Sequence, residues 1–552
     1  MIHTITDTIA RAIHDIYQFD VTPELTRPSA EFGDFSTNIS LKLAGELGKK
    51  PRDIAENIAK RLRESEHFTD VTVAGPGFIN MTIADHSLLE IWSLEALQTM
   101  TRKTVVVEYS DPNPFKVLHA GHLYTSVMGD AIANLFESAG ATVHRVNFGG
   151  DVGLHVGKTM WAMLQNLDGE HPEKLDEIVA DQRAEWMANC YVVGTQAYET
   201  DESAKAEITA LNKRVYQLHA NNDHESALAH IYWTTRQWSY DYFDSFYERI
   251  GSHFEKYYPE SQTADRGLKE VRAQIGEVFA ESDGAVVFAG EAFGLHTRVF
   301  INREGLPTYE TKDVGLVFTK YDDYHFDRSI IITANEQEQY MAVVLKAIEQ
   351  FAPDLAHATT HLTHGMVKLA GGVKMSSRLG NFLRAVDVLD AARVAQHAQN
   401  GTDDERISLG AVKYAFLKQR MGGDLVYQPD ESVSLQGNSG PYLQYAYARA
   451  HSILEKVTAP AELASELDQY ERALARQLSE YPEVLATSID SMMPHHVCTY
   501  LYSLAQTFNR FYEHSHVVGD PREGIRRLLV ERYAQTLAAG LKLLNIATPE
   551  KI

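Results

Sequence analysis

Cysteine is scarce, since the 552 residues contain only Cys190 and Cys498. Two thiols are too few for a disulfide framework or a thiolate zinc site. Long apolar runs are also missing, because no stretch approaches the roughly 20 residues that a membrane span needs. Residues 1–17 lack the basic start and small-residue cleavage site of a secretory signal. We therefore expect a cytoplasmic protein with no membrane partner.

Basic residues are in deficit, because 51 lysines and arginines face 75 acidic residues and give a formal net charge of −24. Phosphate binding uses Lys and Arg, so this balance argues mildly against a nucleic acid as partner. An acidic protein can still carry a local basic face, and the arginines after Pro494 could form one. Composition leaves the partner open, and the length predicts about three to four domains.

Residues 1–98 are expected to form a small α+β domain. Apolar residues recur at helical spacing through Ile2–Tyr17 and Pro51–Leu62, and Pro51 suits the first turn of a helix. Polar and apolar residues alternate through Val71–Ile83 around a Gly-Pro-Gly turn. That pattern predicts two short strands.

A different pattern begins after residue 98. The β-branched run Thr104–Tyr109 predicts a buried parallel strand, a helix is expected at about 121–138, and Thr142–Asn147 predicts the next strand. This order predicts a doubly wound, Rossmann-like α/β domain over 99–404, with further strands at 298–302 and 329–333. Residues from about 156 to 295 are predicted to be a helical insertion, and 405–552 an α-helical bundle.

The segment His119-Ala120-Gly121-His122 lies between the first strand and its helix. The two histidines could be capping or packing residues, or half of a metal site that lacks nearby Cys or carboxylate ligands. They could also bind phosphate, because a helix start attracts anions and imidazoles can donate hydrogen bonds. Gly121 would let a nucleotide approach the backbone.

A second cationic segment, Lys374-Met375-Ser376-Ser377-Arg378, lies in a Gly-rich, loop-like stretch far downstream. A cationic loop near the carboxyl ends of the strands would suit a triphosphate. The alternative is a solvated basic turn. In this order the two segments resemble the HIGH and KMSKS elements of class I aminoacyl-tRNA synthetases.

Further motifs are similar to those of arginyl-tRNA synthetases, and they occur in the same order: GDFSTN at 33–38, GPGFIN at 75–80, EYSDPNPFK at 108–116, NFGGDVG at 147–153, PTYETKD at 307–313 and NSGPYLQYA at 438–446. The resemblance covers every predicted domain except the insertion. It implies an enzyme that activates L-arginine with ATP and Mg²⁺, then transfers arginine to the 3′-terminal ribose of arginine tRNA and releases AMP and pyrophosphate. It implies ATP as a substrate, no tightly bound cofactor, no protein-bound metal and a monomer.

The resemblance also implies roles for individual residues. Arginine would be bound by Glu108, Asn113, Tyr309, Asp313 and Gln337. ATP would be bound by His119, Gly121, His122, Lys374, Met375 and Ser376. The catalytic residues would be Lys116, His119, His122, Lys374 and Arg378. The N-terminal domain would contact the tRNA elbow through Asn80, and the bundle would bind the anticodon through Tyr442, Tyr445, Arg449, Asn509 and Tyr512.

The predicted arginine site has a physical basis. A guanidinium is planar and always charged, so it demands fork-shaped acceptors such as a carboxylate, and a tyrosine can bond to it or cover its plane. Tyr309 and Asp313 are four residues apart on an expected helix and would face the same way. The competing interpretation is an ordinary surface helix face.

Several positions depart from the family pattern. Ser377 replaces the second lysine of the KMSKS element, and the resemblance implies that Lys116 compensates for it. Tyr124 stands where an arginine is usual, and Tyr340 stands where a histidine is common. Two rivals remain: a catalytically silent tRNA-binding relative, suggested by Ser377 alone, and a ligase that joins an amino acid to a small molecule. The retained residues of the expected arginine pocket argue against the first, and the terminal domains argue against the second.

Overall fold

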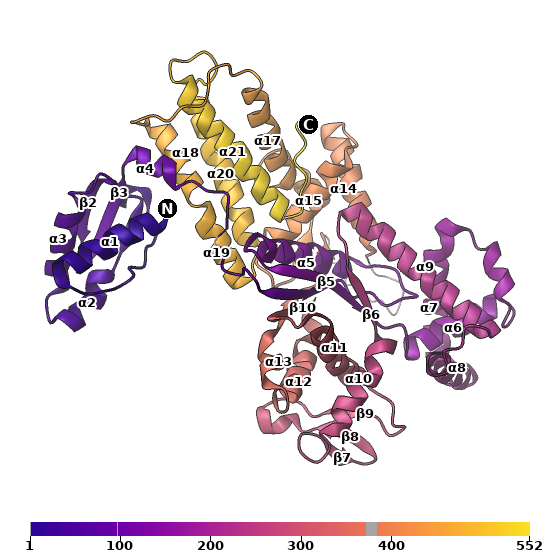
Figure 1. Ribbon diagram of the computed structural model, residues 1–552. Coiled ribbons are helices and arrows are strands. Elements are labelled where there is room, and N and C mark those ends of the chain that lie inside the picture. Colours follow the sequence, from indigo (N-terminus) through magenta and orange to yellow (C-terminus); the bar gives the residue numbers. More distant parts are fainter. Residues whose placement is uncertain (1, 97, 371–382, 552) are drawn as a thin grey trace.

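The computed structural model describes residues 2–96, 98–370 and 383–551. Figure 1 shows a central sheet with a helical bundle on one side and a smaller lobe on the other. Inserted helices extend from one end of this sheet, and the N-terminal domain lies next to the bundle. Among the described helices, none is both long enough and apolar enough to cross a bilayer.

The N-terminal domain contains an antiparallel sheet in the order β1-β3-β2. Its elements are α1 (Ile2–Tyr17), β1 (Phe35–Thr37), α2 (Ile39–Leu47), α3 (Pro51–Leu62), β2 (Phe68–Ala74), β3 (Phe78–Ile83) and α4 (Asp85–Ile91). Ile5, Ile9 and Ile13 recur every four residues on α1 and are all buried in the core. The two predicted helices and the strands around the Gly-Pro-Gly turn are confirmed.

The central sheet is parallel, with strand order β11-β10-β4-β5-β6. Its strands are β4 (Thr104–Glu108), β5 (Thr142–Gly149), β6 (Lys256–Pro259), β10 (Arg328–Ala334) and β11 (Thr359–His364). Counted along the chain this is the order 3-2-1-4-5, so the predicted doubly wound, Rossmann-like α/β fold is confirmed. The order reverses between β4 and β10, and a binding crevice is expected at their carboxyl ends.

Helices cover both faces of this sheet. On one face α5 (Ala120–Ser138) contacts β4, β5 and β10. The opposite face carries α10 (Glu260–Ala273), α11 (Tyr309–Tyr324), α12 (Glu338–Glu349) and α13 (Pro353–Ala358) (Figure 1). The buried residues Leu123, Val127, Ala131 and Leu135 form the predicted apolar face of α5.

Up to Ile250 the predicted insertion is helical, as expected. Its helices are α6 (Leu154–Asn166), α7 (Arg183–Thr200), α8 (Glu202–Ala220) and α9 (Ala227–Ile250), and they share a hydrophobic core of their own. Beyond that point α10 is a further helix, but β6 lies at the edge of the central sheet, and the sequence did not predict this strand. A four-residue edge strand with no β-branched residue gives no clear strand pattern. The strands β7 (Ala280–Ser282), β8 (Ala285–Phe288) and β9 (Arg298–Ile301) then form a separate antiparallel sheet.

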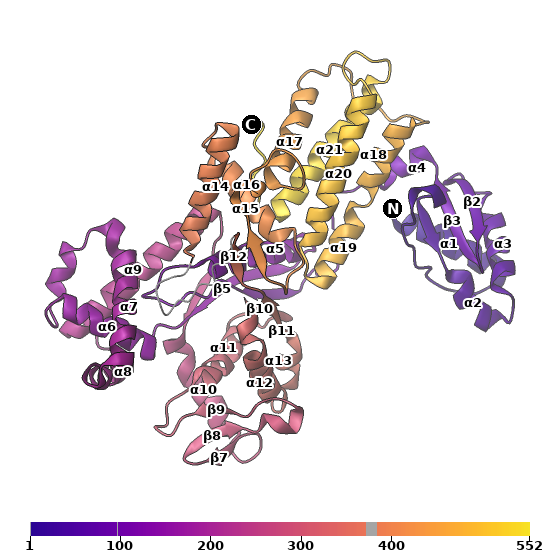
Figure 2. The same ribbon diagram turned by 180° about the vertical axis from the view of Figure 1, so that it is seen from behind.

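The predicted C-terminal helical bundle is confirmed. It contains α15 (Glu405–Leu417), α16 (Pro429–Ser432), α17 (Gly440–Leu454), α18 (Gln469–Ser479), α19 (Tyr481–Ser491), α20 (His495–His514) and α21 (Glu523–Leu543). It is preceded by α14 (Ala385–Asn400), and the short strands β12 (Val367–Leu369) and β13 (Leu425–Tyr427) pair with each other. Seen from behind, α14, α15 and α16 lie above the central sheet, where α14 and α15 contact α5 (Figure 2).

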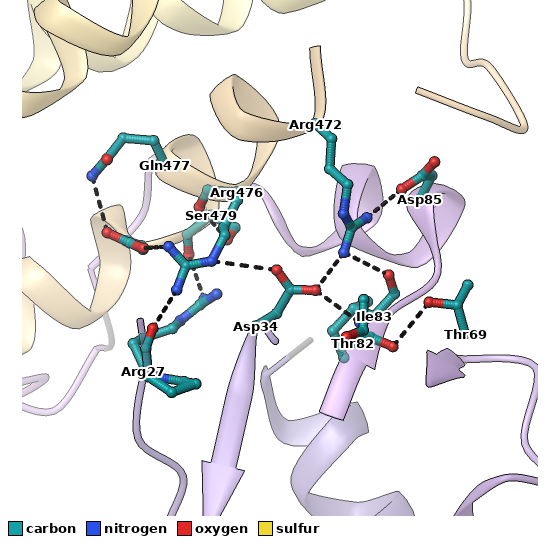
Figure 3. Close-up of polar contacts among 12 residues, drawn as sticks. Arg27, Asp34, Thr69, Thr82, Ile83, Asp85, Arg472, Arg476, Gln477 and Ser479 are labelled. Atoms are coloured by element: carbon teal, nitrogen blue, oxygen red, sulfur yellow. Dashed lines mark hydrogen bonds and ion pairs between the residues drawn. The ribbon is translucent and has the colours of Figure 1, made fainter. Parts of the chain in front are cut away.

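The N-terminal domain is joined to the bundle by buried and half-buried charges (Figure 3). Arg472 of α18 donates to the buried Asp34 carboxylate at 2.5 Å and also pairs with Asp85. Arg27 pairs with Glu483 of α19 at 2.9 Å. Charge-assisted, multidentate arginine pairs have a fixed geometry, so these contacts fix the orientation of the domain on the bundle.

Candidate active site

The start of α5 is capped by its own two histidines. His119 Nδ1 accepts a hydrogen bond from the Gly121 N–H at 3.1 Å, and His122 Nδ1 accepts from the His119 N–H at 3.1 Å. The rings stack with their centroids 3.7 Å apart. Because each Nδ1 accepts, each neutral ring carries its proton on Nε2. Within the described residues neither Nε2 has a hydrogen-bond partner, so both N–H groups can serve a ligand.

Both imidazoles are neutral near pH 7. Burial, and then the charge of Lys116, lowers the pKa of His119 to about 4. Burial, and then the charge of His119, also lowers the pKa of His122. The capping and phosphate-binding interpretations are compatible, because they use different ring nitrogens. The metal interpretation lacks a third ligand anywhere in the described part of the chain.

Gly121 is required by this cap. A Cβ at that position would lie 2.8 Å from Cε1 and 2.9 Å from Nδ1 of His119. A side chain would therefore displace the imidazole and break its hydrogen bond to the backbone. The expected approach of a nucleotide over Gly121 stays a prediction.

The loop at 109–116 is held in a strained conformation. Its positive φ angles are 73° at Ser110, 49° at Asp111 and 69° at Phe115. Such conformations persist only where the surroundings fix them. Asp111 Oδ1 accepts from the Phe148 N–H at 2.8 Å, and Asn113 Oδ1 accepts from the Gly150 N–H at 2.7 Å. These bonds position the segment that carries Asn113 and Lys116.

Lys116, His119 and His122 form what we call the histidine half of the site. The charge of Lys116 acts on both histidines and also on Glu260. Its Nζ lies 4.5 Å from the ring centroid of Tyr191 on α7. Among the described residues, Lys116 has no ion-pair or hydrogen-bond partner. Within that part of the chain, no carboxylate neutralises its positive charge by direct contact.

The adjoining acidic half of the site contains Glu108, Asp111, Glu260 and Asp313. Lys320 pairs with Glu108, and Lys312 pairs with Glu260 at 2.5 Å. These lysines balance two of the four carboxylates, so the acidic half can accept further positive charge. A Cβ on Gly150 would lie 2.9 Å from Asn113 Oδ1 and 3.0 Å from Glu260 Oε1, so the loop that carries Asn113 and Lys116 lies beside the acidic half.

Asp313 is a buried carboxylate that accepts a hydrogen bond from the Tyr340 hydroxyl. Burial raises the pKa of Asp313 to about 8, the Tyr340 hydrogen bond lowers it, and the charge of Glu108 raises it. A cation that entered this half would favour the ionised form. Asp313 therefore has the environment of a binding residue for a positively charged ligand.

The other predicted arginine-binding residues lie around the crevice. Tyr309 begins α11 and is 56% exposed, one turn before Asp313, which is 8% exposed. The surface-helix interpretation does not fit Asp313, because that carboxylate is buried. Glu108 ends β4, whereas Gln337 is exposed in the turn after β10. Both residues thus stand at the carboxyl ends of the two strands that flank the switch point.

The predicted cationic loop, with Lys374, Met375, Ser376, Ser377 and Arg378, lies outside the described residues. The chain that follows it is described. The Ala120 N–H donates to the Leu383 carbonyl at 2.8 Å, and the Ala385 N–H donates to the Leu118 carbonyl at 2.9 Å. The residues after the loop therefore run beside His119.

The predicted tRNA-binding residues have different surroundings. Asn80 lies on the central strand β3 and is only 8% exposed, so little of its side chain is accessible. In the bundle, Arg449 Cζ lies 5.0 Å from the ring centroid of Tyr445, and Asn509 donates to the Tyr442 hydroxyl at 2.7 Å. A cavity of about 880 Å³ is lined by Tyr445, Arg449 and Tyr512, among others.

Four site residues were missed in the sequence. Asp111 lies within the EYSDPNPFK motif but was not assigned a role there. Lys320 lies seven residues after Asp313, two turns along the same helix, so helical periodicity could have identified it. Lys312 lies within the PTYETKD motif but was not assigned a role there. Glu260 follows the short strand β6 and carries no local pattern of its own.

Family models cover most of the chain. Residues 86–428 match the model described as tRNA synthetases class I (R), catalytic domain. Residues 3–83 match the arginyl tRNA synthetase N terminal domain, and residues 443–552 match the DALR anticodon binding domain. All three segments lie in the order expected from the sequence motifs.

Individual proteins are similar over the full length. The arginine–tRNA ligase of Frankia casuarinae is 33% identical over 96% of this chain and 94% of its own length. That of Porphyromonas gingivalis is 28% identical over 99% of both. The structure of Thermus thermophilus arginyl-tRNA synthetase aligns over 100% of both chains with a TM-score of 0.81 and 25% identity. The chain belongs to the arginyl-tRNA synthetase family of the class I tRNA synthetases.

Proposed function

We propose that this chain is an arginine–tRNA ligase, which activates L-arginine with ATP and loads it onto the 3′-terminal ribose of arginine tRNA. The observation that carries this proposal is the pairing of the acidic half with the histidine half at the β4–β10 switch point. The acidic half suits the guanidinium and ammonium of arginine, and the histidine half suits a triphosphate.

In this proposal the acidic half binds arginine. Asp313 accepts two guanidinium hydrogen bonds, and the exposed ring of Tyr309 covers or bonds to the same group. Glu108 and Gln337 bind the α-ammonium, and Asn113 binds the α-carboxylate. A neutral amino acid of the same shape is rejected, because it leaves the buried carboxylate unpaired.

The histidine half binds ATP. The Nε2–H groups of His119 and His122 donate to phosphate oxygens at the N-terminus of α5, next to Gly121. Lys116 supplies positive charge, and Lys374, Met375, Ser376 and Arg378 are proposed to complete the phosphate site. Mg²⁺ enters with ATP as part of the substrate, held chiefly by phosphate oxygens.

The chemistry needs positioning and charge stabilisation, with no covalent nucleophile from the protein. A carboxylate oxygen of arginine attacks the α-phosphorus in line, and the bond to pyrophosphate breaks. Lys116 and the two Nε2–H donors stabilise the charge that develops on the leaving pyrophosphate. The terminal ribose hydroxyl of tRNA then attacks the arginyl carbonyl carbon of the adenylate, and AMP leaves.

The proposal extends to the partner and the setting. The bundle cavity lined by Tyr445, Arg449 and Tyr512 combines aromatic faces with a cation, a combination that suits splayed anticodon bases. Tyr442 and Asn509 border this region, and Asn80 marks the N-terminal domain as a contact for the tRNA elbow. The protein acts as a cytoplasmic monomer on arginine, ATP and arginine tRNA.

Pyrophosphate exchange and tRNA charging test the proposal together. Each amino acid is offered singly, with and without arginine tRNA. Arginine alone should support charging, and exchange should be detected with arginine in at least one condition. Exchange with lysine or cysteine in place of arginine, or charging of a small acceptor but no tRNA, would reject the assignment.

A further inference from the structure

The insertion contributes a side chain to the histidine half. Most of α6, α7, α8 and α9 packs around a core of its own, with Cys190 of α7 buried in it. The next residue, Tyr191, is half-buried and lies under the Lys116 ammonium, 4.5 Å from ring centroid to Nζ. Tyr191 is also an electrostatic neighbour of Tyr309, at the edge of the acidic half.

The site lysines are held in two different ways. Lys312 and Lys320 are ion-paired with Glu260 and Glu108. Lys116 has no such partner among the described residues, although Glu260 is an electrostatic neighbour. A carboxylate partner would neutralise the ammonium, whereas an aromatic face attracts it and leaves its charge and N–H donors available.

The position of Tyr191 is fixed by close helix packing. A Cβ on Gly194 would lie 1.9 Å from the Lys158 carbonyl oxygen, so α7 touches the backbone of α6 at that point. Gly194 lies three residues after Tyr191 on the same helix. The α6–α7 contact therefore sets where the ring stands relative to Lys116.

We propose that Tyr191 is a positioning residue for the phosphate-binding ammonium of Lys116, and that the insertion thereby forms one wall of the ATP site. This inference rests on the proposed function, which assigns phosphate binding to Lys116. It explains how a lysine next to an acidic cluster stays free of carboxylate partners. It also predicts that the face of the ring, and not its hydroxyl, performs this role.

The test compares Tyr191→Leu, Tyr191→Phe and the control Tyr198→Leu. Tyr198 is matched because it lies on α7, is also half-buried, and has its ring centroid 4.6 Å from the ammonium of a different lysine, Lys158. Tyr191→Leu should raise the Kd for ATP and lower kcat/KM for ATP in exchange by about fivefold to tenfold, with KM for arginine unchanged. Tyr191→Phe should recover wild-type values, and Tyr198→Leu should match wild type.

Two results would overturn the role of Tyr191. One is wild-type ATP binding in a folded Tyr191→Leu protein. The other is a Phe variant as impaired as the Leu variant. In a Lys116→Ala background, Tyr191→Leu should add no further loss of ATP affinity, and an additive loss would also count against the role. If wild type binds ATP but shows no arginine-dependent exchange, the proposed function fails, while the ATP Kd series still decides the role of Tyr191.

Discussion

The two halves of the crevice handle charge in opposite ways. In the acidic half Glu108, Glu260 and Asp313 are buried, and the carboxylates are only partly balanced by Lys312 and Lys320. In the histidine half the imidazoles are neutral donors, and Lys116 supplies a positive charge that no carboxylate of the described residues contacts. Two imidazolium charges there would repel the cationic amino acid next door. Neutral donors allow the site to bind phosphate without that repulsion.

The largest predicted effect is in the acidic half. Asp313→Asn should lower kcat/KM for arginine by about 10³-fold, because the guanidinium loses its ionic partner in a buried site. Arginine charging measures this loss. Asp322→Asn is the control, since Asp322 is exposed on the same helix and pairs with Arg266 at 3.1 Å. A loss below tenfold would show that Asp313 does not bind the guanidinium.

The next effect belongs to the histidine half. Lys116→Ala should lower the rate of pyrophosphate exchange by about 10²-fold, because the developing charge on pyrophosphate loses its cation. KM for arginine should change little, because the histidine half binds ATP and the acidic half binds arginine. Lys158→Ala, which removes a lysine held over Tyr198, should exchange at the wild-type rate. Equal damage from both variants would indicate a general structural effect.

A smaller loss is expected when one neutral donor is removed. His119→Ala should lower exchange by about 30-fold, since a hydrogen bond to a charged phosphate is lost. The pKa of His119 is lowered to about 4, so the wild-type rate should show no titration of this residue near pH 6.5. A pH profile of exchange from 5 to 8 measures this, with His144→Ala as the control on β5. An inflection near 6.5 that disappears in His119→Ala would mean that the imidazole acts as a cation.

The smallest effect concerns the pH dependence of the acidic half. Arginine binds the ionised form of Asp313, so KM for arginine should fall as pH rises through about 8. Tyr340→Phe removes a hydrogen bond that lowers this pKa, so the profile should move to higher pH and KM should rise a few-fold below pH 8. Steady-state charging between pH 6.5 and 9 measures the shift. An unchanged profile would show that the Tyr340 hydroxyl does not affect the ionisation of Asp313.

Local patterns predicted most helices and strands and the motifs of the site. They did not predict which strands pair or which charged side chains of the site pair. The Ile5–Ile13 spacing and the Thr104–Tyr109 run were sufficient for α1 and β4, because each pattern lies within one segment. The strand β6 was missed, since only its pairing with β5 makes it a strand. In His119, Nδ1 accepts a backbone hydrogen bond and Nε2–H is left for a ligand. This division depends on how the helix is capped.

The acidic half shows the same limit. The PTYETKD motif indicated Asp313, but the ion pair of Lys312 with Glu260 joins residues far apart in the chain. No local pattern specifies such a contact. The exposure of the Asn80 side chain could not be predicted from local sequence either, because it depends on neighbours on both sides of β3. Its contact with tRNA stays a prediction.

The central claim is that the acidic half recognises positive charge next to a triphosphate site. Citrulline tests it most directly, because it has a neutral ureido group in place of the guanidinium and is otherwise of similar shape. With arginine tRNA present, arginine should support pyrophosphate exchange at least about 10³-fold better than citrulline in kcat/KM. Comparable exchange with the two amino acids would contradict the claim.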